Sequence, residues 1–216
     1  MTLYTGFHSP CLDAQIGFKQ VLDSLSQPGK INTYENWHFN WPTLNNASVA
    51  CLLALCDQDT PVFIDKTLAL SDISRSVAFH TQSKLTEQLC DAHFAFLDES
   101  IDLESLEQLN IGTDISPESS AFVIIQTKQL PQVTDNNDST PTDKAVLKEL
   151  GQTTLRLTGP GILGSRMITT ALPVDILTYL VEGRKAFPKG VDFILTHQNS
   201  MLGIARTTQL EVISCM

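Results

Sequence analysis

The sequence predicts an α/β or α+β fold in which helices cover a β-sheet, and three observations carry this prediction. Helical and strand patterns alternate along most of the chain. The last thirty residues alternate between apolar and polar positions as a β-hairpin does. The length of 216 residues, with 42% hydrophobic content, suits one sizeable core and is too short for two. We therefore expect residues 1–216 to form a single domain.

The first third of the chain holds two predicted helices and two predicted strands. Apolar residues at helical spacing predict an amphipathic helix over 12–26, which the Ser26-Gln27-Pro28-Gly29 turn ends. A strand follows at 30–34. Residues 45–57 are apolar nearly all round, which indicates a helix buried on more than one side, and a short strand is predicted at 61–64.

The middle of the chain alternates less regularly, through the segments 70–77, 77–80, 93–97, 103–109 and 121–127. The polar stretch 131–144 has no large apolar residue after Val133, so it buries too little to stay ordered. We expect it to be a mobile surface loop. The remaining predicted elements are a strand at 154–158, a Gly159-Pro160-Gly161 turn, a helix at 174–185 and the final hairpin.

The final hairpin ends in a cation and two hydroxyls, Arg206-Thr207-Thr208. The planar guanidinium of Arg206 suits a carboxylate, a phosphate or a backbone carbonyl. One interpretation is a structural clamp in which Arg206 pairs with Asp192, with Glu211 or with backbone carbonyls. The other interpretation is an anion-binding or partner-facing site.

The turn Thr158-Gly159-Pro160-Gly161-Ile162 also has two interpretations. Glycine amides that follow a strand can cradle an anion, and Arg166 is the nearest cation in the sequence. However, Pro160 removes one donor, and the turn has none of the usual phosphate-binding glycine patterns. The alternative is that Gly159 and Gly161 supply backbone angles that other residues avoid.

The charge and the cysteine content of the chain indicate which partners and which cellular compartment to expect. The formal charge of −10 gives no support for nucleic acid or an anionic membrane as a partner. The five cysteines form an odd set without a C-x-x-C pair, so we expect reduced core thiols in a cytoplasmic protein. No secretory signal pattern and no membrane-length apolar run is visible, in line with a cytoplasmic location.

The sequence shows no pattern typical of a self-contained active site. The five histidines are scattered without metal-ligand spacing, and no cysteine lies near enough in the sequence to complete a set. Gly164-Ser165-Arg166 lacks the second glycine of a serine-nucleophile turn. We therefore expect no metal, no cofactor and no catalytic residues in this chain alone.

Four separated segments resemble, in the same order, the PhnH family, whose members are subunits of the carbon–phosphorus lyase complex of bacterial phosphonate breakdown. The segments are Leu25-Ser26-Gln27-Pro28-Gly29, Leu157-Thr158-Gly159-Pro160-Gly161-Ile162, Phe187-Pro188-Lys189-Gly190-Val191-Asp192 and Arg206-Thr207-Thr208. The resemblance covers nearly the whole chain. It departs from the family pattern at Ala205, where the family usually has proline, and at 131–144, which is longer than typical.

The resemblance implies a three-layer α/β/α sandwich with a mixed β-sheet, similar to the large domain of fold-type I PLP-dependent transferases but without PLP. It implies a homodimer in isolation and the core subunits PhnG, PhnI and PhnJ as partners. It also implies a shared reaction, the alpha-D-ribose 1-methylphosphonate 5-triphosphate synthase step, in which a phosphonate displaces the adenine of ATP. On this hypothesis the chain is a non-autonomous subunit that supports transfer of the ribose triphosphate moiety to an alkylphosphonate.

These interpretations give two sets of candidate residues. The candidates for binding a ligand or a partner are Gly159, Gly161, Arg166, Asp192, Arg206, Thr207 and Thr208. The candidates for an apolar interface are Trp37, Phe39 and Trp41, with the final hairpin. A second hypothesis is a stand-alone phosphate- or nucleotide-binding protein or small-molecule enzyme, with Gly159, Gly161, Arg166 and Arg206 converging on a phosphate. A third is a scaffold without a ligand.

Overall fold

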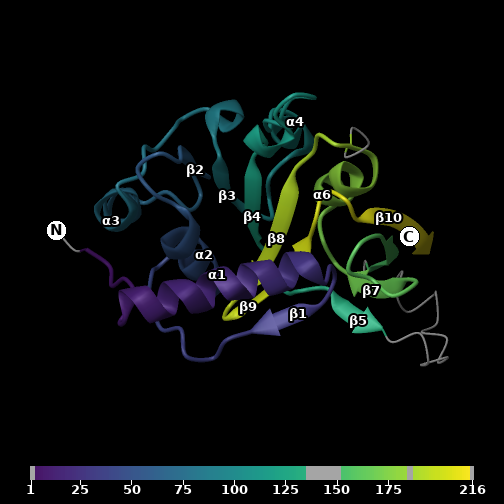
Figure 1. Cartoon of the computed structure of the whole chain (residues 1–216), viewed down its shortest axis with the longest axis horizontal. Coiled ribbons are helices and arrows are strands. Elements are labelled where there is room, and N and C mark those ends of the chain that lie inside the picture. The colour runs from purple at the N-terminus through teal and green to yellow at the C-terminus, as the bar shows by residue number, and fades with distance from the viewer. Residues whose placement is uncertain (1–2, 135–151, 184–186, 215–216) are drawn as a thin grey trace.

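The computed structural model describes residues 3–134, 152–183 and 187–214, which are built around a six-stranded mixed sheet (Figure 1). Its strands are β1 (Ile31–Thr33), β2 (Val62–Ile64), β3 (Phe94–Asp98), β4 (Phe122–Gln126), β8 (Asp192–His197) and β9 (Ser200–Ile204). Their order is β1-β9-β8-β4-β3-β2. Strands β2, β3, β4 and β8 run parallel, whereas β9 is antiparallel to both β8 and β1.

Strands β8 and β9 form the predicted C-terminal hairpin. Phe193 pairs with Ile204 and His197 pairs with Ser200 across it, and Gln198 in the turn has a φ of +51°. The hairpin lies inside the sheet, because β4 pairs with β8 on one side and β1 pairs with β9 on the other. Both strands of the hairpin are therefore paired on both sides.

Three helices cover one face of the sheet: α1 (Pro10–Ser26), α2 (Asn46–Leu55) and α3 (Ser71–Thr81). Asn45 caps α2, because its side-chain oxygen accepts a hydrogen bond from the amide of Ser48 at 2.9 Å. Helix α1 approaches α2 closely at Gly17, where a Cβ would lie 3.1 Å from the Cβ of Ala54. The predicted helices at 12–26 and 45–57 are confirmed.

Shorter helices cover the opposite face. They are α4 (Leu103–Glu107) and α6 (Val174–Thr178), which continues as the π-helical turn η3 (Tyr179–Gly183). Leu97, Ile125 and Leu195 pack on this side, while Phe96, Ile124 and Ile194 pack under α1 and α2, because side chains alternate along each strand. The described residues therefore form a mixed α/β fold with helices on both faces of a mixed sheet.

A second sheet, which the sequence did not predict, lies beside the first. Its strands are β5 (Gln132–Thr134), β6 (Thr153–Thr158), β7 (Arg166–Thr170) and β10 (Gln209–Ser214), in the antiparallel order β10-β6-β7-β5. Leu155, Leu157 and Ile168 form its core. The loop predicted at 131–144 is wrong for Gln132–Thr134, because these residues pair with β7. The rest of that loop, 135–144, lies outside the described residues.

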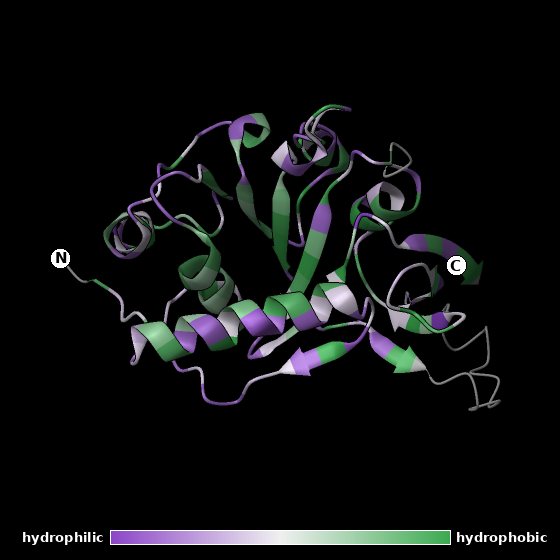
Figure 2. Ribbon diagram, viewed as in Figure 1, coloured by the Kyte–Doolittle hydropathy of each residue, from purple (hydrophilic) through white to green (hydrophobic). Residues whose placement is uncertain are grey.

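Hydropathy follows these layers (Figure 2). The central strands of the large sheet and α2 are mostly hydrophobic, whereas α1 carries both kinds of residue along its length. The burial of residues 47–52 in α2 agrees with the prediction of a helix covered on more than one side. No helix in the described parts of the chain is long and apolar enough to cross a membrane.

Candidate functional site

The four segments singled out in the sequence come together where the two sheets join. A Cβ at Gly161 would lie 1.9 Å from the carbonyl oxygen of Ser26, and a Cβ at Gly159 would lie 2.8 Å from the carbonyl oxygen of Thr207. Both glycines also have a positive φ, +81° at Gly161 and +133° at Gly159. Glycine is therefore needed at both positions for space and for backbone angle. The two glycines of this turn therefore have a structural role, which is to let the turn pack against the backbone of Ser26 and Thr207.

Arg206 is held by the carboxylate of Asp192. The backbone amide of Arg206 donates to Oδ1 at 2.6 Å, and its Nε and Nη2 donate to Oδ2 at 2.9 and 2.7 Å. Its Nη1 donates to the carbonyl oxygen of Pro117 at 2.7 Å. The side chains of Arg206 and Asp192 are 21% and 14% exposed. The predicted clamp thus forms with Asp192, while Glu211 accepts from Nε of Arg156 on the second sheet at 3.1 Å.

The segment before β8 fastens a neighbouring loop, 111–117. The amide of Gly190 donates to the carbonyl oxygen of Ile111 at 2.9 Å, and Nζ of Lys189 lies 3.2 Å from Oδ1 of Asp114. The hydrogen bond from Nη1 of Arg206 to the carbonyl oxygen of Pro117 reaches the same loop. Three polar contacts therefore tie this loop to the end of the hairpin.

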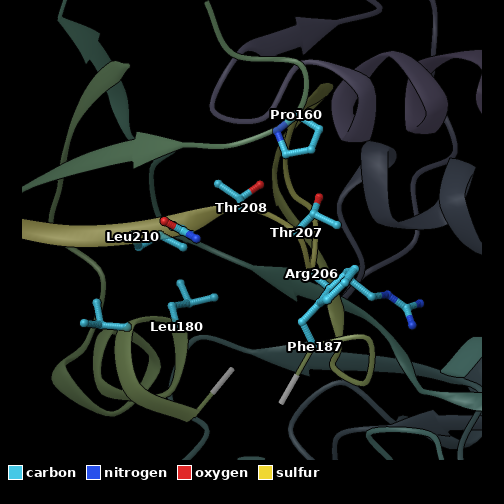
Figure 3. Close-up of a pocket in the computed structure, with 9 residues that line it drawn as sticks. Pro160, Leu180, Phe187, Arg206, Thr207, Thr208 and Leu210 are labelled. Atoms are coloured by element: carbon cyan, nitrogen blue, oxygen red, sulfur yellow. The ribbon is translucent and has the colours of Figure 1, made fainter. Parts of the chain in front are cut away.

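A cleft of about 600 Å³ opens at the junction (Figure 3). Figure 3 shows Pro160, Thr207 and Thr208 on one side of it and Leu180 on the other, with the guanidinium of Arg206 turned away from Leu180. The walls are mainly apolar, and they are formed by Pro160, Leu180, Val181, Phe187, Arg206, Thr207, Thr208, Gln209 and Leu210. Such a cleft suits an apolar side chain better than a phosphate.

Thr208 and Phe187 both line the cleft, but their side chains differ in exposure. Oγ1 of Thr208 is buried and has no hydrogen-bond partner within the described residues. Thr208 is 5% exposed, so its hydroxyl is covered by the chain itself. Phe187, by contrast, is 69% exposed. Phe187 is therefore the large apolar side chain that a second molecule could cover at this cleft.

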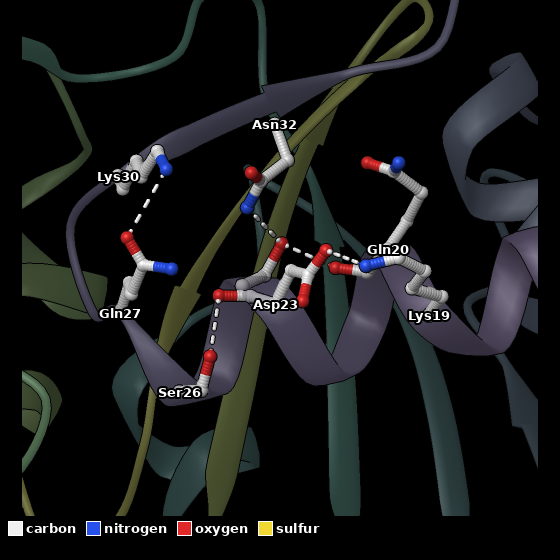
Figure 4. Close-up of polar contacts among 8 residues, drawn as sticks. Lys19, Gln20, Asp23, Ser26, Gln27, Lys30 and Asn32 are labelled. Carbon is white, nitrogen blue, oxygen red and sulfur yellow. Dashed lines mark hydrogen bonds and ion pairs between the residues drawn. The ribbon is translucent and has the colours of Figure 1, made fainter.

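Arg166 holds the turn that follows α1. Its Nη1 donates to the carbonyl oxygen of Gln27 at 3.2 Å and also to that of Pro28. Figure 4 shows that the same turn is held from within, by a bond from Nζ of Lys30 to Oε1 of Gln27 at 3.1 Å. Arg166 therefore connects the second sheet to the end of α1, as a clamp of backbone carbonyls.

The hydrogen bonds of Arg166 and Arg206 weaken the hypothesis that the candidate residues bind a phosphate. Arg206 lines the cleft together with Pro160, which follows Gly159, but the guanidinium groups of Arg166 and Arg206 both bind acceptors of the protein itself. A phosphate site needs free donors that converge on one point. The hypothesis that these residues bind a phosphate stays a prediction, and the geometry gives it no free guanidinium.

Comparison with known proteins decides the family. The family model for the bacterial phosphonate metabolism protein PhnH matches residues 5–211. The chain belongs to the PhnH family. A curated relative from Rhizobium meliloti (strain 1021), the alpha-D-ribose 1-methylphosphonate 5-triphosphate synthase subunit PhnH, is 30% identical over 211 residues, which is 97% of this chain and 96% of the relative.

The four segments that resemble the PhnH family are thus neighbours in space. Gly161 meets Ser26, Gly159 meets Thr207, and Asp192 binds Arg206, so each segment contacts another. The glycine contacts are close packing against backbone carbonyls, and the Asp192–Arg206 contact is an ion pair within the chain. In this member of the PhnH family the segments build the junction of the two sheets and one wall of the cleft.

The aromatic interface candidates lie elsewhere and are not on the surface. Trp37, Phe39 and Trp41 are 3%, 5% and 5% exposed, and they belong to the core beneath α1 and α2. Nε1 of Trp41 donates to the carbonyl oxygen of Thr5 at 2.9 Å, which ties the N-terminal segment to this core. Burial inside the chain does not support an interface role for these three side chains, which stays a prediction.

The cysteines divide into two kinds. Cys51 and Cys56 are buried, as predicted, and burial raises the pKa of the Cys51 thiol to about 12 and the pKa of Cys56 well above its usual range. Cys11 and Cys90 are exposed, so the prediction of core thiols is wrong for them. Cys215 lies outside the described residues. Among the described residues no three His, Cys, Asp or Glu side chains are grouped to hold a metal.

Two residues of the junction were missed in the sequence. A Cβ at Gly203 would lie 2.4 Å from the carbonyl oxygen of Ser24, so glycine there lets α1 cross β9 closely. A glycine inside an apolar strand is a recognised sign of such an approach, and it could have been used. Pro117, which accepts from Arg206, carries no sequence signal because its contact uses the backbone.

Proposed function

We propose that this chain is a non-autonomous subunit of the carbon–phosphorus lyase core complex and supports transfer of the ribose triphosphate moiety of ATP to an alkylphosphonate. The observation that carries the proposal is similarity over 97% of the chain to a relative that is named as a subunit of the corresponding synthase. The chain is thus expected to act inside an assembly.

The junction cleft is our candidate for the surface that another subunit covers. It is mainly apolar, its rim carries the 69% exposed side chain of Phe187, and its cation is neutralised by Asp192. A second apolar hollow of about 250 Å³ shares Val181 with it and is lined also by Val174, which is 62% exposed. Exposed apolar surface of this kind is typical of protein interfaces.

The partners we propose are PhnG, PhnI and PhnJ, and we propose a homodimer for the isolated chain. We also propose that the layered fold shares its architecture with the large domain of fold-type I PLP-dependent transferases. These finer points rest on the sequence resemblance. Light scattering of the purified chain tests the homodimer, since a monomer mass at micromolar concentration would refute it.

The assembly role is tested by reconstitution. The chain is mixed with PhnG, PhnI and PhnJ, and co-purification and conversion of ATP plus methylphosphonate are measured for the chain alone and for the mixture. We expect no turnover by the chain alone and turnover by the mixture. Robust turnover by the purified chain, or failure to co-purify, would contradict the proposal.

A matched pair of variants tests the cleft. Phe187→Ala removes the exposed ring at the cleft, and Phe79→Ala removes a ring of similar exposure, 62%, from α3 on the other part of the molecule. We expect Phe187→Ala to weaken co-purification at least tenfold and Phe79→Ala to leave it unchanged. Equal behaviour of the two variants would remove the cleft as the docking surface.

A further inference from the structure

The edge of the second sheet at β10 is open. The two sheets have four edge strands, and two of these, β1 and β5, are only three residues long. The edge strand β2 is covered in part, since the amide of Val62 donates to the carbonyl oxygen of Lys84 and the amide of Thr86 donates to that of Val62. Strand β10 pairs with β6 alone, in regular register over 209–212. It is therefore the longest uncovered edge in the described parts of the chain.

Half of the backbone groups of this edge point away from the sheet. In an antiparallel strand the N–H and C=O groups of successive residues face opposite sides, so β6 can satisfy only every second residue of β10. Residues 209–214 make no backbone hydrogen bond to any other segment that the structure describes. A row of unpaired donors and acceptors is a template for another strand. The edge therefore offers main-chain hydrogen bonds to an extended polypeptide.

Two hollows adjoin β10 on one face of its sheet. Leu210 lines the junction cleft, and Val212 lines the second hollow, the one of about 250 Å³. Residues i and i+2 of a strand lie on the same face, about 7 Å apart. Val181 of η3 lines both hollows, so they are continuous. The hollows therefore follow one another as the alternate side chains of a single strand do.

The layer of α6 and η3 leaves apolar side chains exposed at these hollows. Val174 of α6 lines the second hollow and is 62% exposed, and Phe187 lines the junction cleft and is 69% exposed. Leu210 and Val212 are half-buried. A strand added to an open edge places its alternate side chains in pockets beside that edge. The exposed apolar surface is thus of the kind that strand addition covers.

The charges of the two hollows fit uncharged side chains. Among the described residues, two ionisable ones line the hollows, namely Arg206 and Glu182. The guanidinium of Arg206 is bound by Asp192, and Glu182 is exposed. Neither hollow therefore offers a free cation or a buried carboxylate to a charged group. Apolar residues at positions i and i+2 of an added strand are the complement of this surface.

A second copy of the chain fits this edge less well than another protein does. If β10 of a copy paired with β10 antiparallel, the apolar side chains it could offer on this face would be its own Leu210 and Val212. These side chains already pack with Val181 against the core of the second sheet. The copy would also bring its own layer of α6 and η3 to the same face. The occupant is therefore a segment of another protein, with no layer of its own on that face.

We propose that an extended segment of another subunit adds as a strand to the edge of β10 and places two apolar side chains, two residues apart, in the junction cleft and the second hollow. The inference rests on the proposed function, which supplies a partner subunit. Hydrogen bonds to the backbone of 209–212 hold the segment, and the two hollows select apolar residues at its positions i and i+2.

Amide exchange at single-residue resolution tests the strand pairing. In the chain alone, every second amide of 209–212 is bonded to β6 and exchanges slowly, while the amides between them exchange fast. We expect these fast amides to slow at least tenfold in the assembly reconstituted with PhnG, PhnI and PhnJ. Those of the other edge, β5, should not change. Fast exchange of the intervening amides in an intact assembly, or equal slowing at β5, overturns the proposal.

Charged variants of either sign test the insertion of apolar side chains. Val174→Asp and Val174→Lys place a charge at the second hollow, on a side chain exposed enough for folding to tolerate it. Leu70→Asp and Leu70→Lys are the matched controls, because Leu70 is 47% exposed and starts α3 at the opposite end of the molecule from β10 (Figure 1). We expect both Val174 variants to weaken co-purification at least tenfold and both Leu70 variants to leave it unchanged. Unchanged co-purification of the Val174 variants, or a loss with one sign of charge only, contradicts the insertion.

The unmodified chain separates this inference from the proposed function. If it does not co-purify with PhnG, PhnI and PhnJ, the proposed function fails and strand addition fails with it. If it co-purifies while the Val174 variants and the intervening amides behave as their controls do, the subunit role stands and strand addition at β10 is refuted. Light scattering of isolated Val174→Asp tests the other occupant. A mass below that of the unmodified chain would show that a second copy covers the edge and would overturn the choice of another subunit.

Discussion

Replacing Gly161 by alanine tests whether backbone contact holds the junction together. The added Cβ would lie 1.9 Å from the carbonyl oxygen of Ser26, so this backbone would have to move by more than 1 Å to reach even 3.0 Å. The φ of +81° adds about 1–2 kcal/mol, because L-residues avoid the left-handed region. Gly164 has a similar φ of +71° but no atom within 4 Å of its Cβ position. Gly164→Ala therefore costs only the free energy of placing an L-residue at a positive φ, with no steric clash.

The expected magnitudes follow from this comparison. Gly164→Ala should lower the free energy of unfolding by about 1–2 kcal/mol. Gly161→Ala should lower it by about 2–5 kcal/mol, since forcing atoms into a packed site adds a further 1–3 kcal/mol. Urea denaturation followed by circular dichroism measures both. Effects that agree within about 0.5 kcal/mol would refute the close contact between Gly161 and Ser26.

Three further predictions concern the ion pair, the buried thiol and Trp41. Asp192→Asn should lower the free energy of unfolding in urea by about 2 kcal/mol, because a mostly buried guanidinium loses its charge partner, whereas Glu211→Gln at an exposed pair should change it by less than about 1 kcal/mol. The pKa of Cys51 rises from its usual 9.0 to about 12 on folding, so its contribution to stability is complete below pH 9 and declines as the pH rises toward 12. Mass spectrometry after brief iodoacetamide treatment at pH 8 should find Cys51 unmodified and the exposed Cys11 and Cys90 modified. Trp41→Phe loses the bond to the Thr5 carbonyl and should cost about 1 kcal/mol in the same urea assay.

Each of these has a contradictory outcome. Equal effects of Asp192→Asn and Glu211→Gln would mean that the clamp adds nothing to stability. Rapid labelling of Cys51 in the folded protein would show that α2 is not buried as described. An unchanged Trp41→Phe variant would show that the indole bond does not hold the N-terminal segment.

The sequence predicted the elements that local patterns determine. The helices at 12–26 and 45–57 have their own apolar periodicity and end signals, and β8 and β9 are adjacent in the chain with a polar turn between them. The sequence analysis also gave Asp192 as one possible partner of Arg206, because both residues belong to this hairpin. The register of the hairpin, with Phe193 opposite Ile204, brings these two residues to the same end.

The second sheet could not be predicted in the same way. Strand β10 pairs with β6, and Arg156 lies opposite Glu211, 55 positions further along the chain. Nothing in either segment specifies that partner. Residues 132–134 look like part of a polar loop, and they become a strand only because β7 lies beside them. Pairing between distant segments overrode the local pattern.

The burial of the aromatic candidates, and the cleft that Asp98, Gln126 and His197 line at the ends of their strands, were not predicted for a related reason. Trp37 and Trp41 stand in a polar, irregular stretch, so their burial depends on α1 and α2 closing over them. Asp98, Gln126 and His197 come from three strands that are far apart in the sequence. Their position after predicted strands was a usable signal, because parallel strands bring their carboxyl ends to one edge. That signal required knowing which strands run parallel.

Hydrogen–deuterium exchange tests most directly whether the family segments face a neighbouring subunit. The exchange of the chain alone is compared with its exchange in the assembly reconstituted with PhnG, PhnI and PhnJ. We expect the amides of residues 187–192 and 207–210 to exchange more slowly in the assembly, while those of α3 are unchanged. An intact assembly in which these two segments exchange as fast as in the isolated chain would contradict the assignment of the junction cleft to a partner.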